Sequence, residues 1–317
     1  MSKQDYIEIK QTFLQMIRGW EARNPELMDG CFTSDVRCFM SIVKDDPHGG
    51  CHGIPGMRQI VECTPKTDTL IIRTYNFAAR IDGDFAAQSC AIVADAGTTK
   101  QTYESFTFTG LFCNEFRKTS EGWKICQIRF DLTDCCGSDT RFLNNWYLGK
   151  PESGWYEGIH LPVICGELDN PWRSVPVSQA ELTDEELIEE AFACYAYGID
   201  TLCFANLDCI LSPDFLSNMA PFSTMDKRSF MQTLKLHRQP SRHWLHPVKT
   251  ATVHIQGDVA NAVFYRTAGH GPRFIPLAAD NIDQELACAR YEVKFRKEEG
   301  IWKLLRLDYF YGGYVIP

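Results

Sequence analysis

The sequence contains two matching halves, and this duplication limits the chain to folds built from two similar units. The segment from Trp20 to Val36 aligns with the segment from Ile199 to Phe215, at an offset of 179 residues. The same offset aligns FRKTSEGW (residues 116–123) with FRKEEGIW (residues 295–302). Between these blocks RIDGD matches HIQGD at a slightly smaller offset, which loop insertions explain. Matching blocks in the same order predict a repeated domain.

Each copy begins with helical patterns and ends with strand patterns, which is typical of an α+β domain. In the second copy Thr183 and Glu186 form a possible capping box before the first helix. A short helix, a strand and a third helix, which Ser223 or Thr224 can cap, come next. The expected elements after the first helix are a helix at 204–211, a strand at 213–220, and strands at 244–256, 259–268, 286–297 and 301–310. We therefore expect helices followed by an antiparallel sheet.

The length of 317 residues and the hydrophobic content of 44% suit two globular domains. We expect copy one over residues 1–132, a connector over 133–182 and copy two over 183–317. The connector holds Trp146, Trp155 and Trp172, so we expect it to pack across both domains. The N-terminus does not resemble a signal peptide and the 14 cysteines form no C-x-x-C pair, which predicts reduced thiols and a cytoplasmic protein.

Charge and motif content argue against several classes of function. The net charge of −9, without a block of basic residues, disfavours a nucleic-acid partner. No stretch approaches the ~20 apolar residues of a membrane span, so we expect no membrane partner. No glycine-rich nucleotide loop and no clustered Cys/His set occurs, which predicts neither cofactor nor metal. Cys135-Cys136 are interpreted as ordinary thiols, and His48 and His52 as residues of a solvated loop.

The phrases YAYGIDTLCFANLDCILSPDF and FRKEEGIWKLLRLDYF, in this order of elements, resemble the SnoaL-like branch of the NTF2-like superfamily. The resemblance covers nearly the whole chain, twice. It implies two cone-shaped α+β barrels in tandem, each a curved antiparallel sheet that wraps a pocket closed by helices. It also implies a small hydrophobic substrate, an internal pseudo-dimer of the two copies and a possible further homo-oligomer.

The second copy is similar to the dehydratase group that includes scytalone dehydratase and the bile-acid dehydratases. In that group a helix Tyr stands five residues before an Asp, which orients a His before the tight turn. Tyr195, Asp200 and His246 occupy these places. His270 stands where scytalone dehydratase has a second catalytic histidine, and Tyr291 stands where it has a pocket asparagine.

The resemblance implies a role for each residue in removing water β to a carbonyl. His246 is the base, because an imidazole has a pKa of about 6.5. Asp200 fixes its tautomer, and Tyr195 donates to the carbonyl oxygen as charge develops there. His270 protonates the leaving hydroxyl, and Tyr291 positions the substrate.

Each of these residues also has a structural interpretation. Asp200 could cap the next helix, and Pro247 could turn His246 away from the interior. His270 lies in a loop-like sequence and could fall outside the pocket. Arg306 could be a substrate-binding cation or could pair with Asp308. Tyr291 shares strand parity with apolar neighbours, which predicts burial without requiring catalysis.

Copy one lacks the same set of polar residues. Its counterparts of Tyr195, Asp200 and His246 are Met16, Glu21 and Ile72, so we expect a structural copy. In copy two Met219 stands where a ketosteroid isomerase of this fold has its Asp base. That mechanism is disfavoured, and a Met-lined pocket predicts a hydrophobic substrate.

The sequence leaves three functions open. The favoured one is a cofactor-independent lyase (dehydratase) or isomerase acting on a hydrophobic hydroxy-carbonyl compound, steroid-like or polyketide-like. The second is a non-catalytic small-molecule-binding or scaffold protein, in which the histidines are incidental. The third is a polyketide cyclase that uses the same residues for an aldol step.

Overall fold

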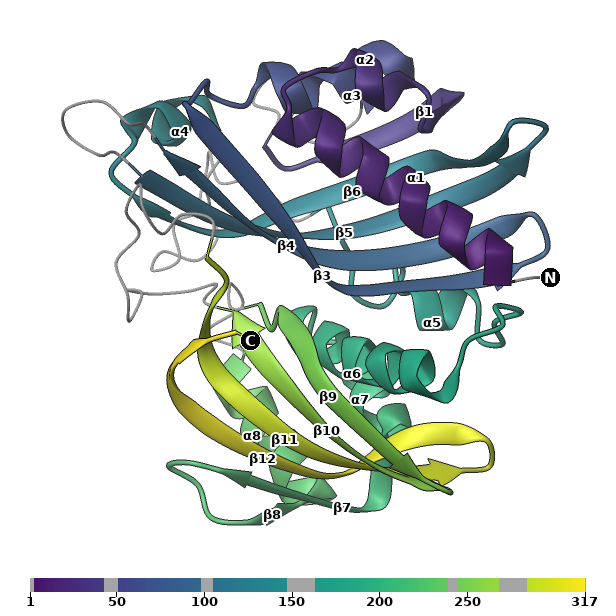
Figure 1. The fold of residues 1–317 in the computed structure, drawn as a ribbon, viewed down its shortest axis with the longest axis vertical. Helices are drawn as coiled ribbons and strands as arrows, with labels where there is room; N and C mark the ends of the chain where they lie inside the picture. Colours follow the sequence, from purple (N-terminus) through teal and green to yellow (C-terminus); the bar gives the residue numbers. More distant parts are fainter. Residues whose placement is uncertain are drawn as a thin grey trace. The chain divides into compact units, whose positions relative to one another are not determined.

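The computed structural model describes residues 3–42, 51–97, 105–146, 163–238, 245–267 and 284–316, and the chain divides into two units (Figure 1). Unit 1 comprises Met1–Glu181 and Ala278–Ile282, and unit 2 comprises Leu182–Leu277 and Asp283–Pro317. Within the described residues each unit has helices and one six-stranded sheet, which confirms the predicted α+β class. The boundaries at 132 and 182 stay a prediction.

Unit 1 is a sheet in the order β2-β1-β6-β5-β4-β3, with α1 lying along it (Figure 1). Its elements in chain order are α1 (Lys3–Glu21), α2 (Glu26–Asp29), β1 (Phe32–Met40), β2 (Cys51–His52), α3 (Gly53–Glu62), β3 (Thr69–Asp82), β4 (Phe85–Gly97), β5 (Ser105–Thr119), β6 (Gly122–Gly137), α4 (Thr140–Asn145) and α5 (Pro171–Ser174).

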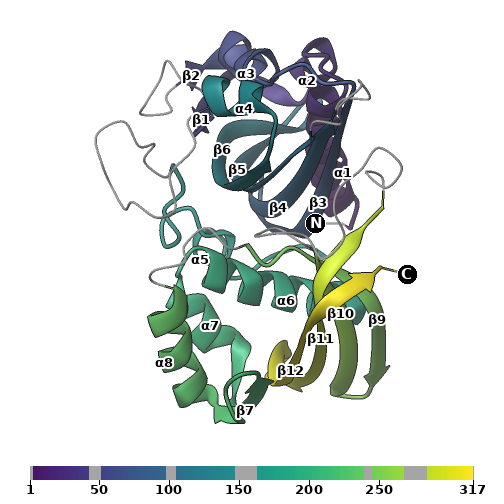
Figure 2. The same ribbon diagram turned by 90° about the vertical axis from the view of Figure 1, so that its left-hand side faces the viewer.

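Unit 2 repeats this arrangement in the order β8-β7-β12-β11-β10-β9, and Figure 2 shows its helices on one side of the curved strands. Its elements are α6 (Asp184–Asp200), α7 (Phe204–Ile210), β7 (Leu211–Met219), β8 (Met225–Asp226), α8 (Lys227–Arg238), β9 (Val248–Gln256), β10 (Val259–Thr267), β11 (Leu286–Glu298) and β12 (Ile301–Val315).

Both sheets are largely antiparallel, as predicted, but each also contains one parallel pair of strands. In unit 1 β1 runs parallel to β6, and in unit 2 β7 runs parallel to β12. Parallel neighbours need a long connection, and β7 is joined to β12 only through α8 and four other strands. The strands joined by tight turns, such as β9 and β10, are antiparallel as expected.

The predicted capping box at the start of α6 is confirmed. The Thr183 hydroxyl accepts from the backbone N–H of Glu186, and the Glu186 carboxylate accepts from the backbone N–H of Thr183. The predicted caps of α8 are wrong, because Asp226 accepts from the backbone N–H of Ser229 at 2.8 Å. β8 keeps the chain extended as far as Asp226, so α8 begins after it.

The duplication is visible in side-chain contacts. In unit 1 the Asp5 carboxylate accepts from Lys118 Nζ at 2.7 Å and from Trp123 Nε1 at 2.8 Å. In unit 2 the Asp184 carboxylate accepts from Lys297 Nζ at 2.6 Å and from Trp302 Nε1 at 2.8 Å. The matching residues lie 179 apart. Each contact ties the first turn of the long helix to the last hairpin of its sheet.

A close approach between helices is also repeated. A Cβ atom on Gly19 would stand 2.3 Å from Met28 Cγ, and one on Gly198 would stand 2.9 Å from Leu207 Cγ. Only glycine leaves room for the short helix against the long one in each unit.

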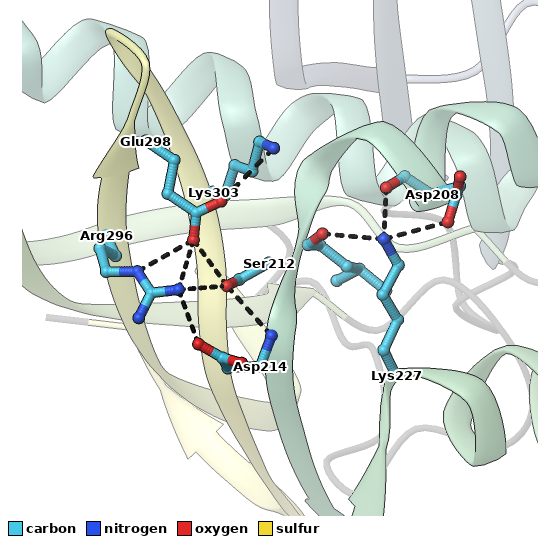
Figure 3. Close-up of polar contacts among 8 residues, drawn as sticks. Asp208, Ser212, Asp214, Lys227, Arg296, Glu298 and Lys303 are labelled. Carbon is cyan, nitrogen blue, oxygen red and sulfur yellow. Dashed lines mark hydrogen bonds and ion pairs between the residues drawn. The ribbon is translucent and has the colours of Figure 1, made fainter.

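Unit 2 also carries a polar network at the start of β7 (Figure 3). Arg296 donates to Ser212 Oγ at 2.9 Å, to Asp214 at 3.0 Å and to Glu298 at 2.6 Å. Hydrogen bonds from Ser212 and Arg296 hold the pKa of Glu298 below its usual value. The matching pair in unit 1, Arg117 and Asp35, lies at 3.4 Å.

Residues 163–181 of the connector bond to strands of unit 1. Arg80 on β3 donates to the carbonyl oxygens of Val175 and Pro176, and Asp131 on β6 accepts from the backbone N–H of Val163. Trp155 lies outside the described residues. The described cysteines are free thiols, and within the described chain each helix is too short or too polar to cross a bilayer.

Candidate active site

Asp200 and His246 form a buried hydrogen-bonded pair in unit 2. Asp200 ends α6, and His246 lies just before β9. The ring nitrogen Nδ1 of His246 lies 2.6 Å from Asp200 Oδ1, and the backbone N–H of His246 donates to Oδ2 at 2.9 Å. Their side chains are 2% and 12% exposed. Both carboxylate oxygens bind His246, so Asp200 does not cap the next helix, and Pro247 does not turn the ring outward.

This geometry defines what the imidazole can do. Because Nδ1 faces the carboxylate, Nε2 is the nitrogen that would accept a proton from a ligand. Burial, with smaller contributions from Arg266 and Arg238, lowers the pKa of His246 to about 4 against the opposing effect of Asp200. The ring is therefore neutral at pH 7, in the form that a general base requires.

Tyr195 and Tyr291 lie in the same interior. Tyr195 on α6 is 1% exposed and Tyr291 on β11 is 2% exposed. Phe192 contacts both rings, at centroid distances of 5.2 and 5.5 Å. Burial raises the pKa of each phenol well above its usual value, so both stay protonated and can donate.

A row of side chains crosses the inner face of the sheet. Phe264 on β10, Tyr291 on β11, Tyr309 on β12 and Met219 on β7 are successive register partners. Tyr309 and Met219 are only partly buried, so this end of the row is open to solvent. Met219 lies on the same face as Phe215, and the Met-lined pocket stays a prediction. Tyr309 was not predicted, although its strand parity with buried Leu307 points to the same face.

Two buried arginines were also missed. Arg238 on α8 is 4% exposed and Arg266 on β10 is 8% exposed. A signal was present for both. Arg238 follows the buried Phe230 and Leu234 at intervals of four residues, which is the inner face of a helix. Arg266 continues the alternation of buried Ala260, Ala262 and Phe264 on β10, which is the inner face of the strand.

The structure favours the ion-pair alternative for Arg306 over a substrate-binding cation. Its side chain is 50% exposed and donates to both carboxylate oxygens of Asp308, at 2.8 and 3.1 Å. Simple alternation from buried Leu304 would turn Arg306 inward, but the register shifts between the two residues and Leu307 is buried instead. His270 lies outside the described residues, so its role stays a prediction.

Unit 1 has a counterpart of the backbone hydrogen bond between His246 and Asp200, but not of the ring hydrogen bond. Glu21, at the end of α1, accepts from the backbone N–H of Ile72 at 2.9 Å. These are the residues aligned with Asp200 and His246 in the sequence. The described residues of unit 1 therefore have the helix-end carboxylate without the imidazole.

Two other features lie apart from this site. A cavity of about 430 Å³ in unit 1 is lined largely by charged side chains, including the exposed Arg37 and Arg117 and the partly buried Glu115. In the described parts of the chain, no group of three or more His, Cys, Asp or Glu residues could hold a metal ion.

Comparison with known proteins agrees with this architecture. The SnoaL-like domain matches residues 2–129 and again residues 180–308. The chain therefore carries two SnoaL-like α+β domains in tandem, each with one six-stranded sheet in the described residues. The chain belongs to the SnoaL-like domain family.

Several solved structures are similar to less than half of the chain each. They include a candidate scytalone dehydratase from Novosphingobium aromaticivorans, with 15% identity over 42% of this chain and 87% of that chain at a TM-score of 0.36. They also include hexachlorocyclohexane dehydrochlorinase LinA-type3 from Novosphingobium barchaimii, with 11% identity over 43% and 94% at 0.35. These values are too low to support an inference about activity. No curated protein sequence matches the chain.

Proposed function

We propose that unit 2 is a cofactor-independent lyase that removes water from a hydrophobic β-hydroxy carbonyl compound, steroid-like or polyketide-like. The observation that supports this most is the His246–Asp200 pair, in which both carboxylate oxygens bind one histidine. A neutral, buried imidazole with an oriented ring is the arrangement that general-base chemistry needs.

The reaction would proceed by proton transfer. Nε2 of His246 takes the proton from the carbon next to the carbonyl, and the electron pair moves onto the carbonyl oxygen. Tyr195 donates a hydrogen bond to that oxygen. The electrons then return to form the carbon–carbon double bond as the β-hydroxyl leaves. His270 gives this hydroxyl a proton, and the products are a conjugated enone and water.

The inner face suits an apolar substrate. Phe192 stacks on Phe264 at 4.1 Å, and Met219 lies at the open end of the same face. Tyr291 would position the substrate through its hydroxyl. Isomerisation and aldol cyclisation begin with the same proton abstraction, so the products distinguish these two alternatives from dehydration.

The test uses a β-hydroxy ketone with a phenyl group on the hydroxyl-bearing carbon. Its dehydration gives a conjugated enone that is followed by ultraviolet absorbance, and exchange of the α-proton in D₂O reports proton abstraction separately. We expect His246→Ala to abolish both signals. The matched control is His254→Ala, because His254 is exposed on β9. Full activity in His246→Ala would refute the role of His246 as the base, whereas no turnover by the wild-type protein would favour a non-catalytic binding protein.

A further inference from the structure

Two buried arginines hold the chain immediately before each member of the His246–Asp200 pair. Arg266 donates from Nε and from Nη2 to the carbonyl oxygen of Leu245, at 3.1 and 2.7 Å. Arg238 donates from Nε to the carbonyl oxygen of Ile199 at 3.4 Å, and its Nη2 lies 4.0 Å from Asp200 Oδ1. Each guanidinium thus binds the residue that precedes one partner of the pair.

The carbonyl of Leu245 needs such a donor because it lies outside the strand ladder. In unit 1 the aligned residue, Ile71, pairs with Asp95 inside β3 and β4. In unit 2 the ladder begins only at Val248, and Pro247 has no N–H to extend it. The side chain of Arg266 takes the place of the missing backbone donor.

Unit 1 shows that the fold itself does not require this arginine. The place of Arg266 is taken there by buried Ile92, as the matching register of the two sheets shows. The carboxylate of Glu21 nevertheless reaches the backbone N–H of Ile72 at 2.9 Å. Unit 2 differs by having both the imidazole of His246 and the guanidinium of Arg266. The guanidinium is therefore associated with the imidazole, whose ring has to be oriented.

We propose that Arg266 and Arg238 are positioning residues that fix His246 and Asp200 in their reacting geometry by holding the carbonyl groups of Leu245 and Ile199. The inference rests on the proposed function of unit 2. It gives these side chains a role in setting the direction of Nε2, separate from contact with the substrate.

The same arginines also control the charge of the ring. The groups that act on His246 are Asp200 from α6, Arg238 from α8 and Arg266 from β10. Tyr291 from β11 and Tyr309 from β12 act on Arg266 in turn. Two cations beside the imidazole oppose its protonation. This effect depends on their charge, whereas the hold on the Leu245 and Ile199 carbonyls depends on their hydrogen bonds.

The experiment compares Arg266→Met, Arg266→Lys and Arg238→Met with Arg306→Met, an arginine of the outer face. The pKa of His246 is measured by NMR titration of the histidine ring without substrate, and kcat is measured with the phenyl-bearing β-hydroxy ketone. Arg266→Met and Arg238→Met should each raise the pKa of His246 by about one unit and lower kcat at least about tenfold. Arg266→Lys keeps the positive charge but cannot make both hydrogen bonds to the Leu245 carbonyl. The pKa of His246 should therefore stay low while kcat falls. Arg306→Met should change neither.

The outcomes separate this inference from the proposed function. An unchanged His246 pKa and unchanged kcat in Arg266→Met would overturn the positioning role. If Arg266→Met does not fold, Arg266→Lys decides, because full activity in that variant shows that the two hydrogen bonds to Leu245 are not needed. A raised His246 pKa in Arg266→Met, with no turnover by the wild-type protein, would refute the proposed function while leaving the charge effect of Arg266 on the ring established.

Discussion

The two units share their order of strands and differ in what fills the interior. Three inner positions of unit 2 are polar where unit 1 is apolar at matching places in the sheet. The pairs are Tyr291 and Phe112, Tyr309 and Phe130, and Arg266 and Ile92. The rings lie alike, since Tyr291–Tyr309 and Phe112–Phe130 have centroid distances of 5.1 and 4.5 Å. A duplicated fold can therefore keep one scaffold and change its chemistry through inner side chains alone.

Unit 1 also fills its interior from outside the repeat. Phe142 of α4 stacks on Phe106 at 4.4 Å, and Trp146 meets Phe108 at 4.8 Å. Both added side chains are buried. This aromatic packing supports the interpretation of copy one as a structural copy.

The largest effect is expected from replacing the helix-end carboxylate in each unit. Asp200→Asn should place an amide against Nδ1 and favour the tautomer with its proton on Nε2, which cannot act as a base. We expect kcat with the β-hydroxy ketone to fall by roughly 10²–10⁴-fold. The matched change in unit 1, Glu21→Gln, should leave kcat unchanged. Equal losses from both variants would contradict the assignment of turnover to unit 2.

The second largest effect is expected on the stability of unit 2 at acid pH, because unit 2 contains the buried imidazole of His246 and unit 1 has Ile72 in its place. The unfolded chain protonates His246 with a pKa of about 6.5, whereas the folded unit does so only with a pKa of about 4. Between these values the unfolded state holds more protons. The free energy of unfolding of unit 2 should therefore fall as the pH drops through this window, by on the order of 3 kcal/mol. Amide hydrogen exchange of unit 2 measures it, with His246→Gln as control. The same acid dependence in both proteins would show that His246 is not its source.

Exchanging one hydroxyl between the units should have unequal effects. Phe112→Tyr places a hydroxyl in the aromatic interior of unit 1 and should cost about 1–3 kcal/mol of its stability. Tyr291→Phe removes the same atom from unit 2 and should cost about 1 kcal/mol or less. Hydrogen exchange in each unit gives both values. A larger loss in unit 2 would mean that the Tyr291 hydroxyl has a structural role.

The smallest effect is expected on the outer face. Arg306→Met removes an exposed ion pair with Asp308 and should change the stability of unit 2 by less than about 1 kcal/mol. Its kcat should equal that of the wild-type protein. A marked loss of activity would restore Arg306 as a residue of the site.

Sequence spacing identified the pair at the centre of the site but missed the residues that support it. Asp200 and His246 stand at the separation expected from the family, and they lie within hydrogen-bonding distance. Arg238 and Arg266 were missed because a charged residue on an apolar face has no motif of its own. Their burial depends on the Leu245 and Ile199 carbonyls, which only the folded chain brings within reach.

The duplication, the α+β class and the capping box at Thr183 follow from the sequence alone, because helix periodicity, turns and caps depend on neighbouring residues. Which charged side chains face inward was decided by the tertiary structure. The register shift in β12 turns Arg306 outward. Because β9 begins only at Val248, the carbonyl of Leu245 lies outside the strand ladder and Arg266 can bind it. Such shifts arise from pairing between distant strands, so they cannot be deduced from a local pattern.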